Sequence, residues 1–257
     1  MAKIIDLNSD LGESFGAWKM GMDDKLVPLV TSVNVACGFH AGDPSVMKKT
    51  VKLALASGTA IGAHPGMPDL VGFGRRKLDI SLDEAYDIVV YQVGALAAFA
   101  KAQGTKLQHV KPHGALYNMA GKDAKLAEAI AQAVYDVDHS LILFALAGSE
   151  SIKAAEKVGL RTASEVFADR SYQEDGSLTP RKLPGAMITD EAASIKQVLS
   201  MVLEQKVTTL SGKVIPVKAE SLCVHGDGEK ALLFTQKIRE ELQKNGVEIA
   251  AAGTFLK

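Results

Sequence analysis

Residues 32–58, SVNVACGFHAGDPSVMKKTVKLALASG, contain a strand, a polar loop and a helix in one stretch. The apolar run at 32–36 predicts a β-strand. Asp43 suits the position that caps a helix and Pro44 suits the first helical turn, so a helix is predicted at 44–57. A strand that leads through a short loop into a helix is typical of a parallel sheet with crossover helices.

The same order of strand and helix continues through most of the chain. Apolar runs predict eight strands, at 3–8, 32–36, 60–63, 107–111, 141–145, 162–166, 221–224 and 247–251. Apolar residues at helical spacing predict helices at 44–57, 85–103, 122–135, 149–158, 189–205 and 228–245. Eight strands that alternate with helices match a (β/α) barrel. We therefore predict an α/β fold, with a single TIM-like barrel domain over residues 1–257.

Two polar excursions interrupt this order, near 170–188 and near 206–219. The first is a long polar loop, and the second has the pattern of a hairpin around residues 211–213. Long excursions from a compact domain often serve as lids or as surfaces for a partner.

The composition excludes several classes of partner. The 29 basic and 30 acidic residues nearly cancel, so neither nucleic acid nor a membrane surface is expected to bind. The chain has no apolar stretch of membrane-spanning length, and its N-terminus lacks the apolar segment of a signal peptide. Cys37 and Cys223 are too few for a disulfide framework and suit reduced thiols. We expect a cytoplasmic protein whose partner is a small molecule or another protein.

The first predicted strand carries polar residues on one face. Its period-two alternation places Asp6, Asn8 and Asp10 on one side, and Ile5 and Leu7 on the other. Burying carboxylates on the inner face of a strand is costly unless they have a use. The strand therefore predicts a functional polar interior.

Four of the six histidines follow predicted strands in glycine- or proline-bearing segments: His40 in GFHAGDP, His64 in GAHPG, His113 in KPHGA and His225 in VHGDG. The carboxyl ends of barrel strands meet at one mouth. The same mouth is expected to receive Asp6, Asn8, Asp10, Glu13, Asn34, Asp43, Lys111, Glu165, Asp169, Arg170 and Asp227. We predict one polar pocket built from these side chains. His109 and His139 are interpreted as structural.

The spacing of these residues leaves the chemistry open. Aspartate and histidine together can bind a divalent metal, or can act as a general base and its orienting partner. The chain has neither an HExxH helix motif nor paired CxxC motifs, so no metal ligands are assigned. It also lacks a P-loop, a GxSxG elbow and a GxGxxG turn after the first strand, which argues against a serine α/β-hydrolase and a dinucleotide-dependent oxidoreductase.

Three further residues admit two interpretations each. Lys111 could stabilise a carboxylate or phosphoryl oxygen, or could form a salt bridge with the carboxylates of the first strand. Arg170 could clamp an anionic group or have a structural partner. Cys37 could be a nucleophile, or could pack among small residues at a strand end, which is the favoured interpretation.

Six segments carry a resemblance to a known family. They are DLNSDLGESFG at 6–16, NVACGFHAGDP at 34–44, GAHPGMPDLVGFGRR at 62–76, VKPHGALYN at 110–118, EVFADRSYQEDGSLTPR at 165–181 and CVHGDG at 223–228. Together they resemble the LamB/YcsF family over almost the whole chain. This resemblance implies a seven-stranded barrel related to the glycoside hydrolase/deacetylase barrels, in which one of the eight predicted strands stands apart.

The resemblance also implies an activity, the ATP-dependent opening of the lactam of 5-oxo-L-proline to L-glutamate together with partner subunits B and C. ATP is then the expected cofactor, with Mg²⁺ as its possible metal, and the subunit that binds ATP is left open. We predict catalytic roles for Asp10, His64, Lys111 and His113. Substrate-binding roles are predicted for Asp6, Asn8, Asn34, His40, Glu165, Asp169, Arg170, His225 and Asp227.

Two other functions stay open on the sequence. The first is a metal-dependent deacetylase or carbohydrate hydrolase on the same barrel, suggested by Asp6, Asp10, His40 and His64. The second is a non-catalytic protein that only presents 5-oxoproline to its partners. A tightly bound, required zinc ion would favour the deacetylase, whereas full turnover by site variants would favour the presenting role.

Overall fold

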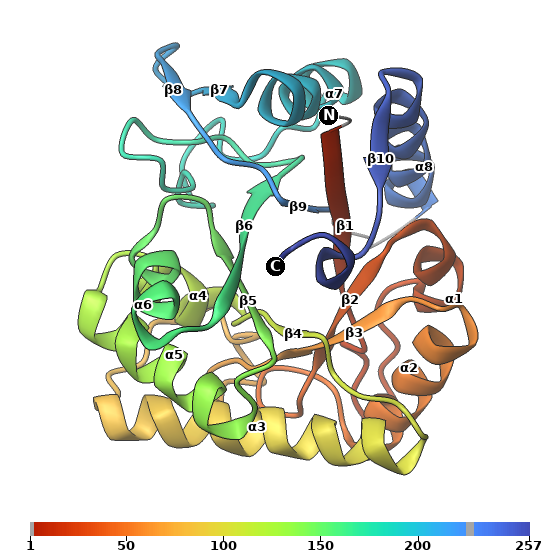
Figure 1. The fold of residues 1–257 in the computed structure, drawn as a ribbon, viewed down its shortest axis with the longest axis vertical. Coiled ribbons are helices and arrows are strands. Elements are labelled where there is room, and N and C mark those ends of the chain that lie inside the picture. Colours follow the sequence, from red (N-terminus) through yellow and green to blue (C-terminus); the bar gives the residue numbers. More distant parts are fainter. Residues whose placement is uncertain (1–2, 225–228) are drawn as a thin grey trace.

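Seven parallel strands close into a barrel in the computed structural model, which describes residues 3–224 and 229–257 (Figure 1). Each strand pairs with the next along the chain, and β9 pairs with both β6 and β1 to close the ring. The seven are β1 (Lys3–Leu11), β2 (Ser32–Ala36), β3 (Ala60–His64), β4 (His109–Val110), β5 (Ile142–Leu146), β6 (Arg161–Phe167) and β9 (Ser221–Cys223).

The eighth predicted strand exists but lies outside the closed ring. This strand, β10 (Val247–Ile249), pairs with the start of β1 at residues 3–5, whereas β9 pairs with β1 at residues 6–8. β10 and β9 lie on opposite edges of β1, as their backbone hydrogen bonds to Ile5 and to Asp6 and Asn8 show, and only β9 bridges to β6. This arrangement confirms the seven-stranded barrel and corrects the match to an eight-stranded ring.

Helices surround the ring (Figure 1), and most of them lie where apolar spacing predicts them. They are α1 (Asp23–Leu26), α2 (Pro44–Ala56), α3 (Leu82–Ala102), α4 (Gly114–Ala120), α5 (Ala124–Val137), α6 (Glu150–Val158), α7 (Glu191–Leu199) and α8 (Glu229–Lys244). A π-helical turn at Ser200–Glu204 extends α7. The sequence did not predict α4, because seven residues that begin at a glycine show too little periodicity.

Side chains cap the starts of α2 and α3, and the cap of α2 is the predicted Asp43. The Asp43 carboxylate accepts hydrogen bonds from the backbone N–H groups of Ser45 and Val46, at 2.8 and 2.9 Å. Ser81 and Glu84 form the reciprocal capping box at the start of α3. These caps begin helices directly after polar loops, so they also fix where those loops run.

The two excursions have different structures. Residues Lys206–Thr208 (β7) and Val214–Pro216 (β8) form the expected antiparallel hairpin. The stretch at 170–188 folds back on itself through bridges between Arg170 and Met187 and between Tyr172 and Leu178. The buried Tyr172 anchors it, because its hydroxyl accepts a hydrogen bond from the Phe167 backbone N–H at 2.9 Å.

The apolar core lies between the strands and the helices, and the barrel interior is largely polar. Along β1, Ile5 and Leu7 belong to the apolar core, while the intervening Asp6 and Asn8 are completely buried in a polar environment. The C-terminal segment covers the amino-terminal end of the ring (Figure 1), where Arg161 donates to the Leu256 carbonyl at 3.2 Å. Among the described residues, no helix is long and apolar enough to cross a membrane.

Candidate functional site

Asp6 lies deepest among the polar residues of β1, and hydroxyl groups surround its carboxylate. Ser32 and Thr31 donate to Oδ1 at 2.6 and 2.8 Å, and Ser221 donates to Oδ2 at 2.5 Å. Complete burial raises the pKa of Asp6 to about 6, although these hydrogen bonds oppose the rise. The structure thus places Asp6 beneath the mouth, as part of the barrel interior.

Lys111 is the centre of a buried charge network one layer above Asp6. Its ammonium lies 2.9 Å from Asp10 Oδ1 and 2.9 Å from Glu165 Oε1, and it donates to Cys223 Sγ at 3.2 Å. Burial disfavours the charged ammonium, but the neighbouring Asp10 and Glu165 carboxylates outweigh burial and hold the pKa of Lys111 well above its usual value. Of the two interpretations offered by the sequence, the structure shows the ion pairs with strand carboxylates.

Amide and hydroxyl groups complete this network. Asn8 donates to Glu165 Oε1 at 2.9 Å, and Tyr117 donates to Glu165 Oε2 at 2.7 Å. Asn34 donates to both Asn8 Oδ1 and Asp10 Oδ1, at 2.7 and 2.9 Å. Each side chain therefore has defined partners, as a buried polar group requires.

His109 supports the network from below. Its Nε2 lies 2.7 Å from Asn34 Oδ1, and its ring stacks on Phe144 with centroids 4.1 Å apart. Burial lowers the pKa of His109 to about 3, so the ring is neutral. These contacts agree with the structural interpretation of His109.

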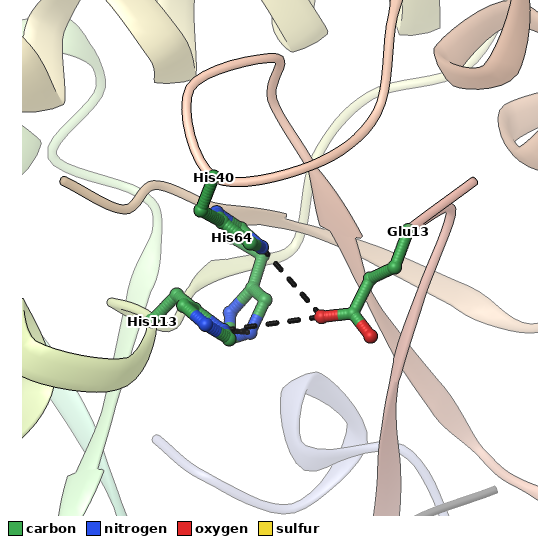
Figure 2. Close-up of side chains that lie close together, drawn as sticks. All are labelled: Glu13, His40, His64 and His113. Atoms are coloured by element: carbon green, nitrogen blue, oxygen red, sulfur yellow. Dashed lines mark hydrogen bonds and ion pairs between the residues drawn. The ribbon is translucent and has the colours of Figure 1, made fainter. Parts of the chain in front are cut away.

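Three imidazoles and one carboxylate converge beside the Lys111 network (Figure 2). They are Glu13, His40 and His113, which follow β1, β2 and β4, and His64, which ends β3. One ligand atom from each residue lies within 4.8 Å of the others, so the four could hold a metal ion. We call these four residues the histidine cluster.

Close contacts hold the histidine cluster together. His64 Nε2 lies 2.9 Å from His113 Nδ1 and 3.3 Å from Asp10 Oδ2. Glu13 Oε1 lies 3.6 Å from His40 Nε2 and 3.9 Å from His113 Nδ1 (Figure 2). His64 and Asp10 thus join the histidine cluster to the Lys111 network.

Backbone carbonyls fix the orientation of two of the rings. His64 Nδ1 lies 2.6 Å from the carbonyl oxygen of Lys111, and His113 Nε2 lies 2.8 Å from that of Phe73. A carbonyl can only accept, so each of these nitrogens carries a proton. The other two nitrogens, His64 Nε2 and His113 Nδ1, face the interior of the cluster and lie 2.9 Å apart.

Glycines make room for the rings. A Cβ at Gly66 would lie 2.5 Å from His40 Nδ1, and one at Gly74 would lie 2.7 Å from His40 Cβ and 2.9 Å from His113 Cδ2. Any side chain at these two positions would displace an imidazole. Burial is the main cause that lowers the pKa of His40 well below its usual value and that of His113 to about 3.

A cavity of about 1130 Å³ opens over both groups of residues. Its base includes Asp10, Glu13, His64, Lys111 and His113, and its outer wall includes residues of α4, the start of α6 and the 170–188 excursion. Basic side chains line much of that wall: Arg75, Lys77, Lys122, Lys153, Arg170, Arg181 and Lys182. The cavity therefore joins polar side chains at its base to a cationic outer part.

The structure separates the predicted site residues by depth. Asp10, His64, Lys111, His113 and Arg170 line the cavity, whereas Asp6, Asn8, Asn34 and Glu165 lie beneath it. His40 lies behind His113, with their parallel rings stacked at 3.7 Å between centroids. Asp169 is partly buried at the start of the 170–188 excursion, and the predicted residues His225 and Asp227 fall outside the described residues.

Two contributors received no role from the sequence. Glu13 was expected at the mouth, but nothing in its spacing linked it to the histidines. Tyr117 follows His113 by one turn of α4, and it could have been found only by recognising that short helix.

Arg170 and Cys37 have structural partners. The Arg170 guanidinium donates to the backbone carbonyls of Thr179 at 2.5 Å and Ala186 at 3.4 Å, which ties the excursion together. Cys37 donates to the Val35 carbonyl at 3.1 Å. Burial raises the pKa of the Cys37 thiol to about 12, which disfavours a nucleophilic thiolate.

Fold and site together define a class, a seven-stranded (β/α) barrel whose mouth carries an imidazole and carboxylate centre beneath a cationic cavity. A sequence model of the LamB/YcsF family matches residues 5–257. The chain belongs to that family.

The chain is similar in sequence to 5-oxoprolinase A subunits over nearly its whole length. The chain is 60% identical over 245 residues to the 5-oxoprolinase A subunit of Clostridium beijerinckii, covering 95% of this chain and 96% of the relative. It is 60% identical over 247 residues to the 5-oxoprolinase A subunit of Bacillus subtilis, covering 96% of each. The crystal structure of the lactam utilization protein from Thermus thermophilus superposes with a TM-score of 0.91 at 48% identity, covering 96% of this chain and 99% of that one.

Proposed function

We propose that this chain is the A subunit of an ATP-dependent 5-oxoprolinase, which opens the lactam of 5-oxo-L-proline to L-glutamate together with partner subunits B and C. The observation that carries the proposal is the 60% identity, over 95% of the chain, to a protein named as the A subunit of 5-oxoprolinase. The polar cavity at the mouth of the barrel supports it, because it provides a site for a small polar substrate.

The reaction explains why such a site would be cationic on one side. A lactam amide resists hydrolysis, and phosphorylation of its oxygen by ATP makes its carbon a better electrophile. Water then adds to that carbon, and the C–N bond breaks as the nitrogen takes a proton, which gives γ-glutamyl phosphate. A second water molecule cleaves this acyl phosphate, so that glutamate, ADP and phosphate result. Substrate carboxylate and phosphoryl oxygens are anionic, and Arg75, Lys77 and Arg181 line the cavity to meet them.

The base of the cavity supplies candidates for proton transfer. Asp10 Oδ2 and His64 Nε2 lie 3.3 Å apart at the cavity base, close enough for one to orient the other or to share a water molecule. Lys111 holds Asp10 from the opposite side at 2.9 Å. In this proposal Asp10 and His64 handle the proton of the attacking water, while Lys111 and His113 position them.

The complex is cytoplasmic, and it uses ATP with Mg²⁺. The other predicted substrate-binding residues stay predictions, with Asp6, Asn8, Asn34 and Glu165 acting from beneath the cavity.

The test uses the complex reconstituted from this chain and its partner subunits, with 5-oxoproline and ATP as substrates and glutamate as the product measured. Asp10→Asn and His64→Gln are each expected to lower kcat by about 10²-fold or more. His139→Asn, at an exposed histidine, is the matched control and should leave kcat unchanged.

Two results would count against the proposal. Failure of the wild-type complex to release glutamate from 5-oxoproline would refute the activity. Full turnover by folded Asp10→Asn and His64→Gln variants would instead favour a chain that only presents substrate to its partners.

A further inference from the structure

We propose that the histidine cluster is a binding site for one divalent transition metal ion of the zinc class. The ligands are Glu13 Oε1, His40 Nε2, His64 Nε2 and His113 Nδ1. The catalytic use of the ion rests on the proposed function, but its binding does not.

The contact between His64 and His113 is the first reason. Their outer nitrogens are protonated because each faces a backbone carbonyl, Lys111 O at 2.6 Å and Phe73 O at 2.8 Å. The inner nitrogens, His64 Nε2 and His113 Nδ1, are therefore the ones that can bind a ligand, and they lie 2.9 Å apart. Two ring nitrogens this close, each with its partner nitrogen fixed by a carbonyl, can bind the same cation.

The carbonyl contacts also match a known feature of metal centres. Histidine ligands in proteins usually donate their second ring N–H to a carbonyl or carboxylate, which fixes the tautomer and the ring orientation. His64 and His113 both have this arrangement. Two such rings beside one carboxylate, Glu13, form a preorganised set of donors.

His40 is the second, independent reason. Its side chain is completely buried, and neither ring nitrogen makes a hydrogen bond to any residue that the structure describes. A buried imidazole without hydrogen bonds is costly. Nε2 lies 3.6 Å from Glu13 Oε1, so the nitrogen is directed toward the other donors.

The geometry needs one adjustment. The His40 and His113 rings are parallel, with an angle of 1° between their planes, so their lone pairs run side by side. A tilt of the His40 ring would direct Nε2 toward a shared ion. That tilt breaks no hydrogen bond with a described residue, because His40 makes none.

The distances and donor types select the ion. Tetrahedral ligands about 2.1 Å from a zinc ion are about 3.4 Å apart. Three of the six separations among the donors, 2.9, 3.6 and 3.9 Å, bracket that value, and all the donors lie within 4.8 Å of one another. Three imidazoles and one carboxylate suit Zn²⁺ and similar transition metals, whereas Mg²⁺ prefers an octahedron of oxygen atoms.

The position of the site connects it to the cavity. Glu13, His64 and His113 all line the cavity base, so an ion held there faces the space assigned to the lactam. A Lewis acid at that place would polarise the carbonyl or lower the pKa of a water molecule. Asp10, 3.3 Å from His64 Nε2, is placed to orient that water molecule.

The test measures binding of Zn²⁺ or Co²⁺ alone to the full chain, after the purified protein has been stripped with a chelator. We expect one equivalent to bind, with the visible absorption of four-coordinate Co²⁺. Glu13→Gln, His64→Gln and His40→Asn should each weaken Zn²⁺ binding by more than about 100-fold. Loss of a residue that only hydrogen-bonds to a metal ligand typically weakens binding by about 10–100-fold, so a larger loss is expected for a ligand itself. His139→Asn should bind as the wild type does, and Mg²⁺ should not compete.

The result that would overturn this inference is clear from the same titration. The metal-site proposal is refuted if the stripped wild-type chain binds no stoichiometric Zn²⁺. It is also refuted if folded Glu13→Gln and His64→Gln variants bind Zn²⁺ as tightly as the wild type does. Glutamate release by a complex that binds no metal at this site would refute only the metal proposal. Loss of one Zn²⁺ site in the variants, together with no 5-oxoprolinase activity in the wild-type complex, would refute only the proposed function.

Discussion

The Lys111 network and the histidine cluster lie side by side at the mouth of the barrel, yet their hydrogen bonding differs. Lys111 contacts Asp10 and Glu165 at 2.9 Å each, and amide and hydroxyl groups bind the same carboxylates. In the histidine cluster, His40 has no hydrogen bond to a described residue, and the inner nitrogens of His64 and His113 face each other. The polar groups of the first group are hydrogen-bonded within the protein, whereas the second includes a buried ring, His40, that is available for a ligand.

This difference suggests that the Lys111 network contributes mainly to stability and the histidine cluster mainly to function. A saturated buried network holds its members in place and is costly to break. A buried ring that makes no hydrogen bond, such as His40, lowers stability until a ligand binds it, and such side chains are expected at functional sites. Substitutions in the two groups should therefore have opposite consequences for the metal-free protein.

The largest effect is expected at Lys111. Lys111→Met removes the cation between two buried carboxylates and should lower the free energy of unfolding by about 3–5 kcal/mol. Urea unfolding at neutral pH measures it. Lys153→Met, which breaks an exposed pair with Glu150, is the matched control and should cost less than about 1 kcal/mol. A decrease of less than about 1 kcal/mol in the free energy of unfolding of Lys111→Met would show that the buried carboxylates do not depend on Lys111.

Asp6 should make the stability depend on pH. Its pKa is raised from 3.8 to about 6 in the folded chain, so its contribution is fully present below pH 4 and is lost as the pH rises through 6. A shift of this size corresponds to about 3 kcal/mol. The difference in unfolding free energy between the wild type and Asp6→Asn should fall by up to that amount from pH 4 to pH 7. A difference that does not change with pH would refute the raised pKa.

Zinc should stabilise the chain through the histidine cluster. At a free Zn²⁺ concentration 100 times Kd, binding to the folded state alone adds about 2.7 kcal/mol. Thermal unfolding of the stripped chain with and without Zn²⁺ measures it. The stabilisation should disappear in His64→Gln and persist in His139→Asn; equal stabilisation of both variants would place the ion elsewhere.

The smallest effect is expected at His40 in the stripped protein. His40→Leu removes a buried polar group that lacks hydrogen bonds, so the free energy of unfolding should stay within about 1 kcal/mol of the wild type or rise. The same variant should lose the added stability from Zn²⁺. A loss of about 3 kcal/mol or more without metal would mean that His40 already has a stabilising partner.

A separate expectation concerns the division of labour. The isolated chain should release no glutamate from 5-oxoproline and ATP, because the proposed reaction requires its partner subunits. Glutamate release by this chain alone, free of contaminating partners, would contradict that expectation.

Local patterns predict much of this fold. The alternation along residues 32–58 predicts a strand and a helix that the structure confirms at Ser32–Ala36 and Pro44–Ala56. The strand that closes the barrel could not be predicted in this way, because the positions of β9 and β10 along β1 depend on pairing between distant segments. No local pattern distinguishes a strand that closes the ring from one that pairs beside it.

The sequence predicts which residues face the barrel interior, but not how far each of them lies below the cavity. Alternation along β1 correctly placed Asp6, Asn8 and Asp10 on the interior face. It could not show that Asp6 lies beneath the cavity while Asp10 reaches it, because side-chain parity fixes a face and not a height. The meeting of Glu13 with three histidines likewise depends on loops from four strands, whose paths only the folded chain defines.

The most direct measurement of the central claim is anomalous X-ray scattering at the zinc edge from crystals of the stripped chain soaked in Zn²⁺. The account predicts one strong peak about 2.0–2.2 Å from Glu13, His64 and His113, with the His40 ring tilted toward it. Peaks only at surface residues such as His139, with the contact between His64 and His113 unchanged at 2.9 Å, would contradict it.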